Sequence, residues 1–282
     1  MRLTKAAGEG MVWRDAGRRA TWRATRRKGG AVPYAIAQKD LTPPSADRMV
    51  RAFEAVPELT HTDAVRLTRN AFGILVRNLA GDRARTLQRA LSAEGVETDI
   101  VNQTVLPKLP GVKRLPRAAV SDGGISFGDM YGRSQRVIWD AVVLVAAGRV
   151  NTGRREFQTR FSTKVRVGYR GSVSKTVVAE KEYEHGSEWK LLLDIVVARP
   201  SARYRIWGEK FNYAYLGARR QSQRWANFSL LGLDIVNRAK RAGYNMGAAS
   251  LLDDPRTTYD YPGLGAFEEE MTWLLWKGGV SL

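Results

Sequence analysis

Two segments near the C-terminus carry apolar residues at the spacing of an amphipathic helix, in which one apolar face recurs every three or four positions. They are Ser222 to Ala242, with Trp225, Phe228, Leu231, Ile235 and Ala239 on that face, and Gly265 to Lys277, with Phe267, Met271, Leu274 and Leu275. The second places Glu268, Glu269 and Glu270 in its first turn, where the helix dipole favours anions. We predict two C-terminal helices and interpret the glutamates as helix-stabilising.

The range 71–105 changes from strand-like to helix-like patterns and back. Ala71 to Val76 is a continuous apolar run typical of a buried strand. Asp82 can cap a helix that continues to about Glu94, and Gly95 stands where a left-handed residue ends a helix. The inward face of that helix holds Ala84, Leu87, Ala90 and Leu91. Because Val96 to Val105 alternates like a second strand, the segment predicts half of a ferredoxin-like unit.

The middle of the chain is rich in strand signals. Pro and Gly interrupt residues 106–124, as is typical of a domain boundary. The strands expected beyond it are 125–131, 135–146, 163–169, 176–183, 189–198 and 203–207. Turns are expected at Gly132–Ser134, at Arg170-Gly171 and, as a hairpin, at Glu184–Ser187. A series of antiparallel strands of this kind predicts a barrel or a sandwich.

Two segments resemble known bacterial domains. The phrase from Asp82 to Ile100, within about 71–105, is similar to the helix and second strand of small signal-transducing α/β plait domains. The segment Gly132 to Gly148, with Ile138-Trp139-Asp140 ahead of Val142 to Val145, resembles part of the pleckstrin-homology-like barrels, and the helix with Asn227-Phe228 and Leu231 resembles their closing helix. This second resemblance covers about 125–242. Together they imply a bacterial α+β protein, with a ferredoxin-like plait at 63–120 and an antiparallel pleckstrin-homology-like barrel with two C-terminal helices at 121–282.

The range 1–62 has sparse, aperiodic apolar residues, so we expect a flexible basic arm there. Its basic residues precede Gly29-Gly30 and include Arg14, Arg18, Arg19, Arg23, Arg26, Arg27 and Lys28. Three interpretations stay open. The arm is inert, or translation starts at Met49; the arm binds a polyanion such as nucleic acid, with Trp13 and Trp22 stacking on bases; or it binds a protein partner.

The formal net charge of +18 changes the picture most among the bulk properties. Residues 1–30 hold nine Lys/Arg and two Asp/Glu, so much of the excess lies in the arm. A basic protein attracts nucleic acid or anionic surfaces, although an Arg-rich composition explains the charge equally well. There is no cysteine, and the longest apolar run, Ala141 to Ala147, is too short to span a membrane. With no signal peptide recognised, we expect a cytoplasmic protein.

Few residues suggest catalysis. His61 and His185 are the only histidines and lack metal-binding spacing, so we predict no metal site and no cofactor. Ser126 lies in a G-x-S-x-G string, but a nucleophile elbow needs a helix directly after the serine, and here another strand follows. We interpret the string as a chance match.

Arginines alternate with aromatic residues from Arg203 to Arg220. Such a segment can bind phosphate and stack on bases, and its candidate anion-binding residues are Arg203, Arg205, Lys210, Arg219 and Arg220. The same alternation is typical of a strand with one buried face, which would hold Tyr204 and Ile206, with Phe211, Tyr213 and Tyr215 packed inward after it.

Three functions remain open at this stage. The first is a non-enzymatic binding module for a protein or an anionic partner. The second is a sequence-independent nucleic-acid-binding protein that uses the basic arm and the Arg/aromatic segment. The third is an enzyme of unfamiliar type, which requires carboxylates such as Asp140, Asp194 or Glu209 to converge in a pocket.

Overall fold

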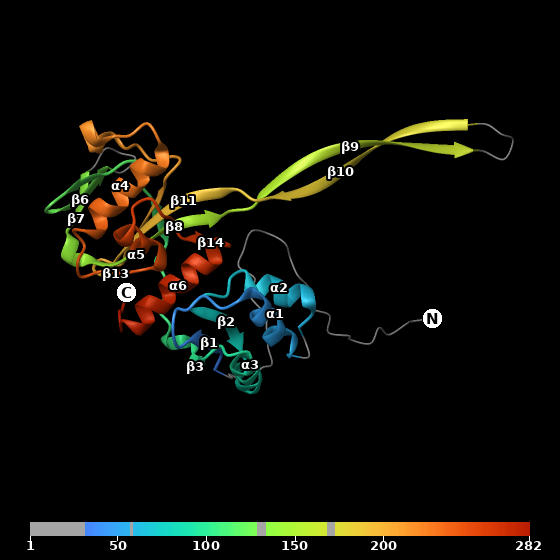
Figure 1. Cartoon of the computed structure of the whole chain (residues 1–282), viewed down its shortest axis with the longest axis horizontal. Helices are drawn as coiled ribbons and strands as arrows, with labels where there is room; N and C mark the ends of the chain where they lie inside the picture. Colours follow the sequence, from blue (N-terminus) through green and yellow to red (C-terminus); the bar gives the residue numbers. More distant parts are fainter. Residues whose placement is uncertain (1–31, 57–58, 129–133, 168–172) are drawn as a thin grey trace, which may run out of the picture.

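The computed structural model describes residues 32–56, 59–128, 134–167 and 173–282. The chain belongs to the α+β class, with several antiparallel sheets (Figure 1). Short 3-10 helices occur at Gln103–Val105, Trp139–Ala141 and Ala214–Arg219. None of the helices in the described ranges is long and apolar enough to cross a membrane.

The N-terminal part forms a three-stranded antiparallel sheet with helices on one face. Its elements are β1 Tyr34–Gln38, α1 Ala46–Glu54, α2 His61–Thr68, β2 Ile74–Leu79, α3 Gly81–Ala93 and β3 Thr98–Asn102. The predicted order of strand, helix and strand at 71–105 is confirmed by β2, α3 and β3. Gly95 follows α3 with φ of +75°, as expected of a residue that ends a helix. Leu87 and Leu91 are buried against α1 and β2 residues such as Phe53 and Val76.

The prediction of a flexible arm over 1–62 is wrong for its second half. β1 is the central strand of the sheet, in the order β2-β1-β3, and α1 buries Met49 and Phe53. The segment lacks a visible period because β1 is short and covered on both faces, with Ile36 towards the helices and Ala35 and Ala37 on the opposite side. Translation from Met49 would therefore remove the central strand. Residues 1–31, with the basic cluster from Arg14 to Lys28, lie outside the described residues.

A larger open sheet forms the centre of the molecule. It contains β8 Val142–Asn151, β11 Trp189–Val197, β12 Ala202–Trp207, β4 Val112–Arg114, β13 Gly243–Tyr244 and β14 Asp260–Tyr261. The strand order is β13-β8-β11-β12-β4, with β14 also paired to β8. β8, β11 and β12 are antiparallel, whereas β4, β13 and β14 join in parallel. The predicted barrel is wrong for the described residues, because these strands form open sheets that do not close.

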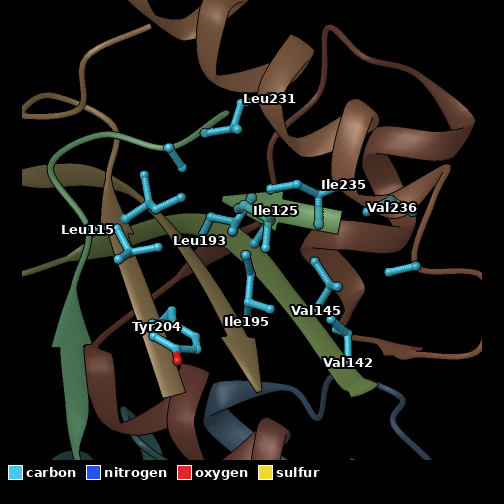
Figure 2. Close-up of a cluster of buried hydrophobic side chains, with 14 of the residues drawn as sticks. Leu115, Ile125, Val142, Val145, Leu193, Ile195, Tyr204, Leu231, Ile235 and Val236 are labelled. Carbon is cyan, nitrogen blue, oxygen red and sulfur yellow. The ribbon is translucent and has the colours of Figure 1, made fainter. Parts of the chain in front are cut away.

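One face of the large sheet carries the largest core of the protein. It is covered by α4 Arg224–Val236, α5 Met246–Asp253 and a small sheet of β5 Ala119–Ser121, β6 Gly124–Gly128 and β7 Ser134–Val137. Figure 2 shows Val145, Leu193 and Ile195 of the sheet pointing towards Ile125 and Ile235. The predicted helix at 222–242 is shorter than expected, and Trp225 at its start is 42% exposed.

The opposite face of the large sheet packs on α6 Leu264–Lys277. Phe267, Met271 and Leu275 contact this sheet, as the predicted apolar stripe requires. The other side of α6 meets the N-terminal sheet, where Trp273 packs on β1 and its indole nitrogen donates to the Gln38 carbonyl at 2.6 Å. One helix is therefore shared by two sheets (Figure 1).

A two-stranded ribbon leaves the body between β8 and β11 (Figure 1). It consists of β9 Arg154–Val167 and β10 Val173–Gly186, which pair only with each other among the described strands. The hairpin predicted at Glu184–Ser187 is wrong, because the chain there passes from the ribbon into β11, and β11 pairs with β8. The turn predicted at Arg170-Gly171 lies outside the described residues.

Candidate functional site

Arg203 and Arg205, two of the predicted anion-binding residues, lie on β12 beneath α6 and are 2% and 5% exposed. Both bind Asp194 of the neighbouring strand β11: the Nε atom of Arg203 is 2.7 Å from Oδ2, and that of Arg205 is 2.8 Å from Oδ1. Glu268 of α6 closes the cluster, with its Oε1 atom 3.1 Å and 3.2 Å from the two guanidinium groups. Two cations and two carboxylates thus neutralise each other.

The electrostatics of this cluster favour a structural role. Burial opposes the charged guanidinium of Arg205, but the hydrogen bonds and negative charge of Asp194 and Glu268 raise its pKa above the ordinary value. A buried charge keeps its ionised form only when it is paired in this way. Neither arginine is therefore available to an anion from outside without breaking the cluster.

The other three predicted residues are not gathered at one place. Arg219 makes a two-pronged ion pair with Asp234 of α4, at 3.0 Å and 2.7 Å, whereas Lys210 and Arg220 are exposed in separate turns. The alternative interpretation of the segment, inward packing, is confirmed for the core residues Tyr204, Ile206, Phe211 and Tyr213. Tyr215 is partly buried, and its hydroxyl donates to Asp234 at 3.2 Å.

The three consecutive glutamates of α6 connect it to three different parts of the fold. The helix starts at Leu264, so Glu268, Glu269 and Glu270 lie beyond its first turn, and the prediction that they stabilise the helix dipole is wrong. Glu268 joins the Asp194 cluster. Glu269 binds Arg77 of β2, with Oε2 2.6 Å from a terminal guanidinium nitrogen. The third glutamate faces α5 and β14.

Glu270 is fully buried in a network of polar groups. It accepts hydrogen bonds from the Tyr261 hydroxyl at 2.5 Å and from the Met246 backbone N–H at 2.8 Å. Asn245, which also caps α5, donates to the Tyr261 oxygen at 2.7 Å and to the Ala147 carbonyl of β8 at 3.0 Å. Burial raises the pKa of Glu270 to about 7, although these hydrogen bonds oppose the rise. The network ties α6, α5, β14 and β8 together.

The carboxylates proposed for an enzyme do not converge. Asp140 is largely exposed, 3.6 Å from Arg241; Asp194 is bound within its cluster; and Glu209 accepts the Leu191 backbone N–H at 2.8 Å. Within the described ranges, no group of three or more His, Asp or Glu residues could hold a metal ion. Ser126 lies inside the antiparallel strand β6 rather than at a strand-to-helix turn, so G-x-S-x-G is a chance match.

The hollows of the body are poor sites for a small substrate. An apolar cavity of about 10 Å³ between α2, α3 and β2, lined by residues such as Leu67, Val76 and Leu87, has room for one water molecule at most. An open depression of about 540 Å³ is lined by Asp82, Arg85 and neighbours that all belong to α3, so no second element closes it. His61 is 73% exposed and contacts only Glu54 in its described surroundings, as expected of a surface histidine.

The ribbon is the feature that sequence reasoning missed. Its two strands were identified separately, as 163–169 and 176–183, but each was assigned to a barrel wall. Their register runs without interruption from Val167↔Val173 to Arg154↔Gly186. The signal was available in the sequence, because an unbroken pairing of two long strands around one short connection is a hairpin rather than part of a barrel.

Comparison with protein-family models, with curated proteins and with solved structures gave no match. Neither resemblance stated above is therefore supported by a relative. The function has to be argued from the geometry of this chain alone.

Proposed function

We propose that this chain is a non-enzymatic binding protein in which the body is a scaffold and the ribbon of β9 and β10 docks onto a partner protein. One observation carries the proposal: two paired strands of 14 residues each extend away from the body and pair with no other strand that the structure describes (Figure 1).

The physical argument concerns what an isolated ribbon lacks. A two-stranded antiparallel pair is at best marginally stable in water, because stable sheets need a third strand or a covered face. Its outer edges also present unpaired backbone N–H and C=O groups, which are a template for another strand. A long ribbon that the body leaves uncovered is therefore suited to association.

The body supports this division of roles by its own arrangement. Its arginine, aspartate and glutamate side chains at Arg203, Asp194 and Glu270 are buried and bound within the fold, which suits a rigid support rather than a reaction site. A rigid base also fixes the direction in which the ribbon points, because β8 and β11 pair continuously up to Asn151↔Trp189 at its foot.

Photo-crosslinking in cells that produce the chain tests the proposal. A photoreactive amino acid is placed at Phe161 or at Ser162 of β9, and at Leu252 of α5 as a control on the body, where Leu252 is 45% exposed. We expect a discrete covalent adduct from a ribbon position and none from Leu252. Adducts of equal yield at all three positions, or at none, would contradict docking through the ribbon.

A second candidate function, nucleic-acid binding, is favoured by the charge of the outer half of the ribbon. Residues 160–175 contain five Lys/Arg and no Asp/Glu. A two-stranded ribbon fits the major groove of DNA, and binding through phosphates weakens steeply with salt. The test is fluorescence anisotropy with labelled DNA and RNA over a salt series, for the full chain, for a chain that starts at Val32 and for a chain without residues 154–186. Binding lost only in the third protein would favour this candidate over a protein partner.

A further inference from the structure

The register of the ribbon divides its residues into two faces. Each pair, such as Phe161↔Ala179 or Ser162↔Val178, joins two odd-numbered or two even-numbered positions. Directly opposite residues of an antiparallel pair lie on the same face, and neighbours along a strand lie on opposite faces. All odd-numbered positions of β9 and β10 therefore share one face, and all even-numbered positions share the other.

The two faces differ sharply in composition. The odd positions are mainly apolar and include Phe157, Phe161, Val165, Val173, Val177 and Tyr183. Among the even positions from 156 to 166 and from 174 to 184, Val178 is the one apolar residue, and the others are Glu, Gln, Arg, Lys, Ser or Thr. This period-2 pattern is typical of a sheet that has one face in a core and one in water. The ribbon alone has no core, so its odd face requires a cover.

The charges along the ribbon indicate the orientation of that cover. The outer part, 160–175, has a formal charge of +5. The part next to the body, 154–159 with 176–186, holds Arg154, Arg155 and Lys181 against four glutamates and is net negative. Two ribbons side by side in the same direction would bring two strongly basic ends together, whereas opposite directions bring each basic end to the other's acidic base.

We propose that the odd face of the ribbon is covered by the same face of a second copy of this chain, with the two ribbons antiparallel about a two-fold axis near Phe161. This inference rests on the proposed docking function and names the partner. A two-fold interface uses one self-complementary patch on both copies, which a ribbon with opposite charges at its two ends provides. The antiparallel direction also keeps the two bodies at opposite ends of the pair.

The size of the odd face sets the strength of the dimer. Fourteen residues at a rise of 3.3 Å make a ribbon about 45 Å long, and two strands make it about 10 Å wide. The pair then covers roughly 900 Å² in total, which is at the low end of specific interfaces. The dimer is therefore reversible and depends on protein concentration.

Sedimentation velocity over a concentration series is the first experiment, with circular dichroism to verify that each variant is folded. The full chain is expected to change from monomer to dimer as its concentration rises. Phe161→Lys places a charge on the odd face and should raise the dimer dissociation constant by about tenfold or more. Ser162→Lys adds the same charge one residue further along, on the even face, and should change it little. Equal effects of the two variants, or a monomer at every concentration, would overturn the proposal.

Disulfide mapping tests the antiparallel direction, and the absence of native cysteine makes it clean. With the axis near Phe161, Val165 of one copy lies over Phe157 of the other. Phe161→Cys alone should form a covalent dimer under mild oxidation. Val165→Cys alone and Phe157→Cys alone should form little, whereas a mixture of the two proteins should form the mixed dimer. Efficient self-linking through Val165→Cys would indicate parallel ribbons and would overturn the proposed arrangement.

The photo-crosslinking result separates this inference from the proposed function. An adduct at Phe161 with the mass of two chains supports both. An adduct with a different protein, from a chain that stays monomeric in the centrifuge, leaves the docking function standing and overturns the second copy as partner. A dimer that forms only when nucleic acid is added overturns it as well.

Discussion

The body and the ribbon use the same kind of strand in opposite ways. In the body, β8 and β11 are covered on both faces, by α6 on one side and by α4, α5 and the small sheet on the other. A few residues further along the same two chain segments, β9 and β10 continue as a pair without a third strand. The difference shows that strand formation and strand burial are separate steps, and that the second depends on what else the chain brings to the sheet.

The Asp194 cluster gives the sharpest way to break the body side of this comparison. Asp194→Ala leaves Arg203 and Arg205 buried with Glu268 as their one remaining partner among the contacts described. We expect a loss of about 3–5 kcal/mol in the free energy of unfolding, measured by urea denaturation. Asp260→Ala breaks an exposed ion pair with Arg149 and should cost about 1 kcal/mol or less. Similar losses for the two variants would show that burial does not set the cost.

Glu270 gives the body a pH dependence. Its pKa is about 7 in the folded protein, above the ordinary value of 4.5, so the folded state binds the proton more tightly than the unfolded state. This contribution to stability is complete below pH 4.5 and is lost as the pH rises to about 7. Relative to Glu270→Gln, which cannot ionise, the native protein should lose about 2–3 kcal/mol between pH 5 and pH 8. A constant difference across that range would contradict a buried, protonated Glu270.

Packing density is tested next, at two glycines. A Cβ atom on Gly247 at the start of α5 would lie 1.9 Å from the Ala147 carbonyl oxygen of β8. Gly247→Ala should therefore lower the free energy of unfolding by about 1–3 kcal/mol, because the backbone contact has to open. Gly111 has no atom within 4 Å of such a Cβ, so Gly111→Ala is the matched control. Thermal unfolding should separate them, and equal melting temperatures would speak against the close contact.

Removal of the ribbon should have the smallest effect on the body. A chain in which an Asn-Gly turn replaces residues 154–186 keeps β8 and β11, whose last bond here joins the Thr152 N–H to the Glu188 carbonyl at 2.8 Å. We expect its Tm to differ by only a few degrees from that of the full chain measured as a monomer. A large fall in Tm would show that the ribbon is part of the folding unit rather than an attachment to it.

The elements that the sequence predicts well are those whose period matches one covered face. α3 and the apolar stripe of α6 are of this kind, because Leu87, Leu91, Phe267 and Met271 recur at helical spacing. β1 could not be found in the same way, because it is covered on both faces by small residues and by Ile36. Its central place depends on contacts with β2 and β3, which lie far along the chain.

Most of the candidate site was predicted wrongly for a related reason. Arginines that alternate with aromatic residues suggest a solvent-facing side of a strand, but α6 covers that side of β12 and supplies Glu268 to Arg203 and Arg205. A sequence does not reveal that a distant carboxylate will neutralise them. The ribbon was missed because its strands were paired with the wrong neighbours, and the division into odd and even faces is visible only once the register is known.

The shared helix also has a consequence for synthesis on the ribosome. α6 follows every strand in the chain, yet it covers one face of the N-terminal sheet and one face of the large sheet. Until residue 277 has left the exit tunnel, both sheets lack a cover that neither can replace. Nascent chains therefore spend the whole of translation with two apolar surfaces open to chaperones, and both are sealed by a single late docking event.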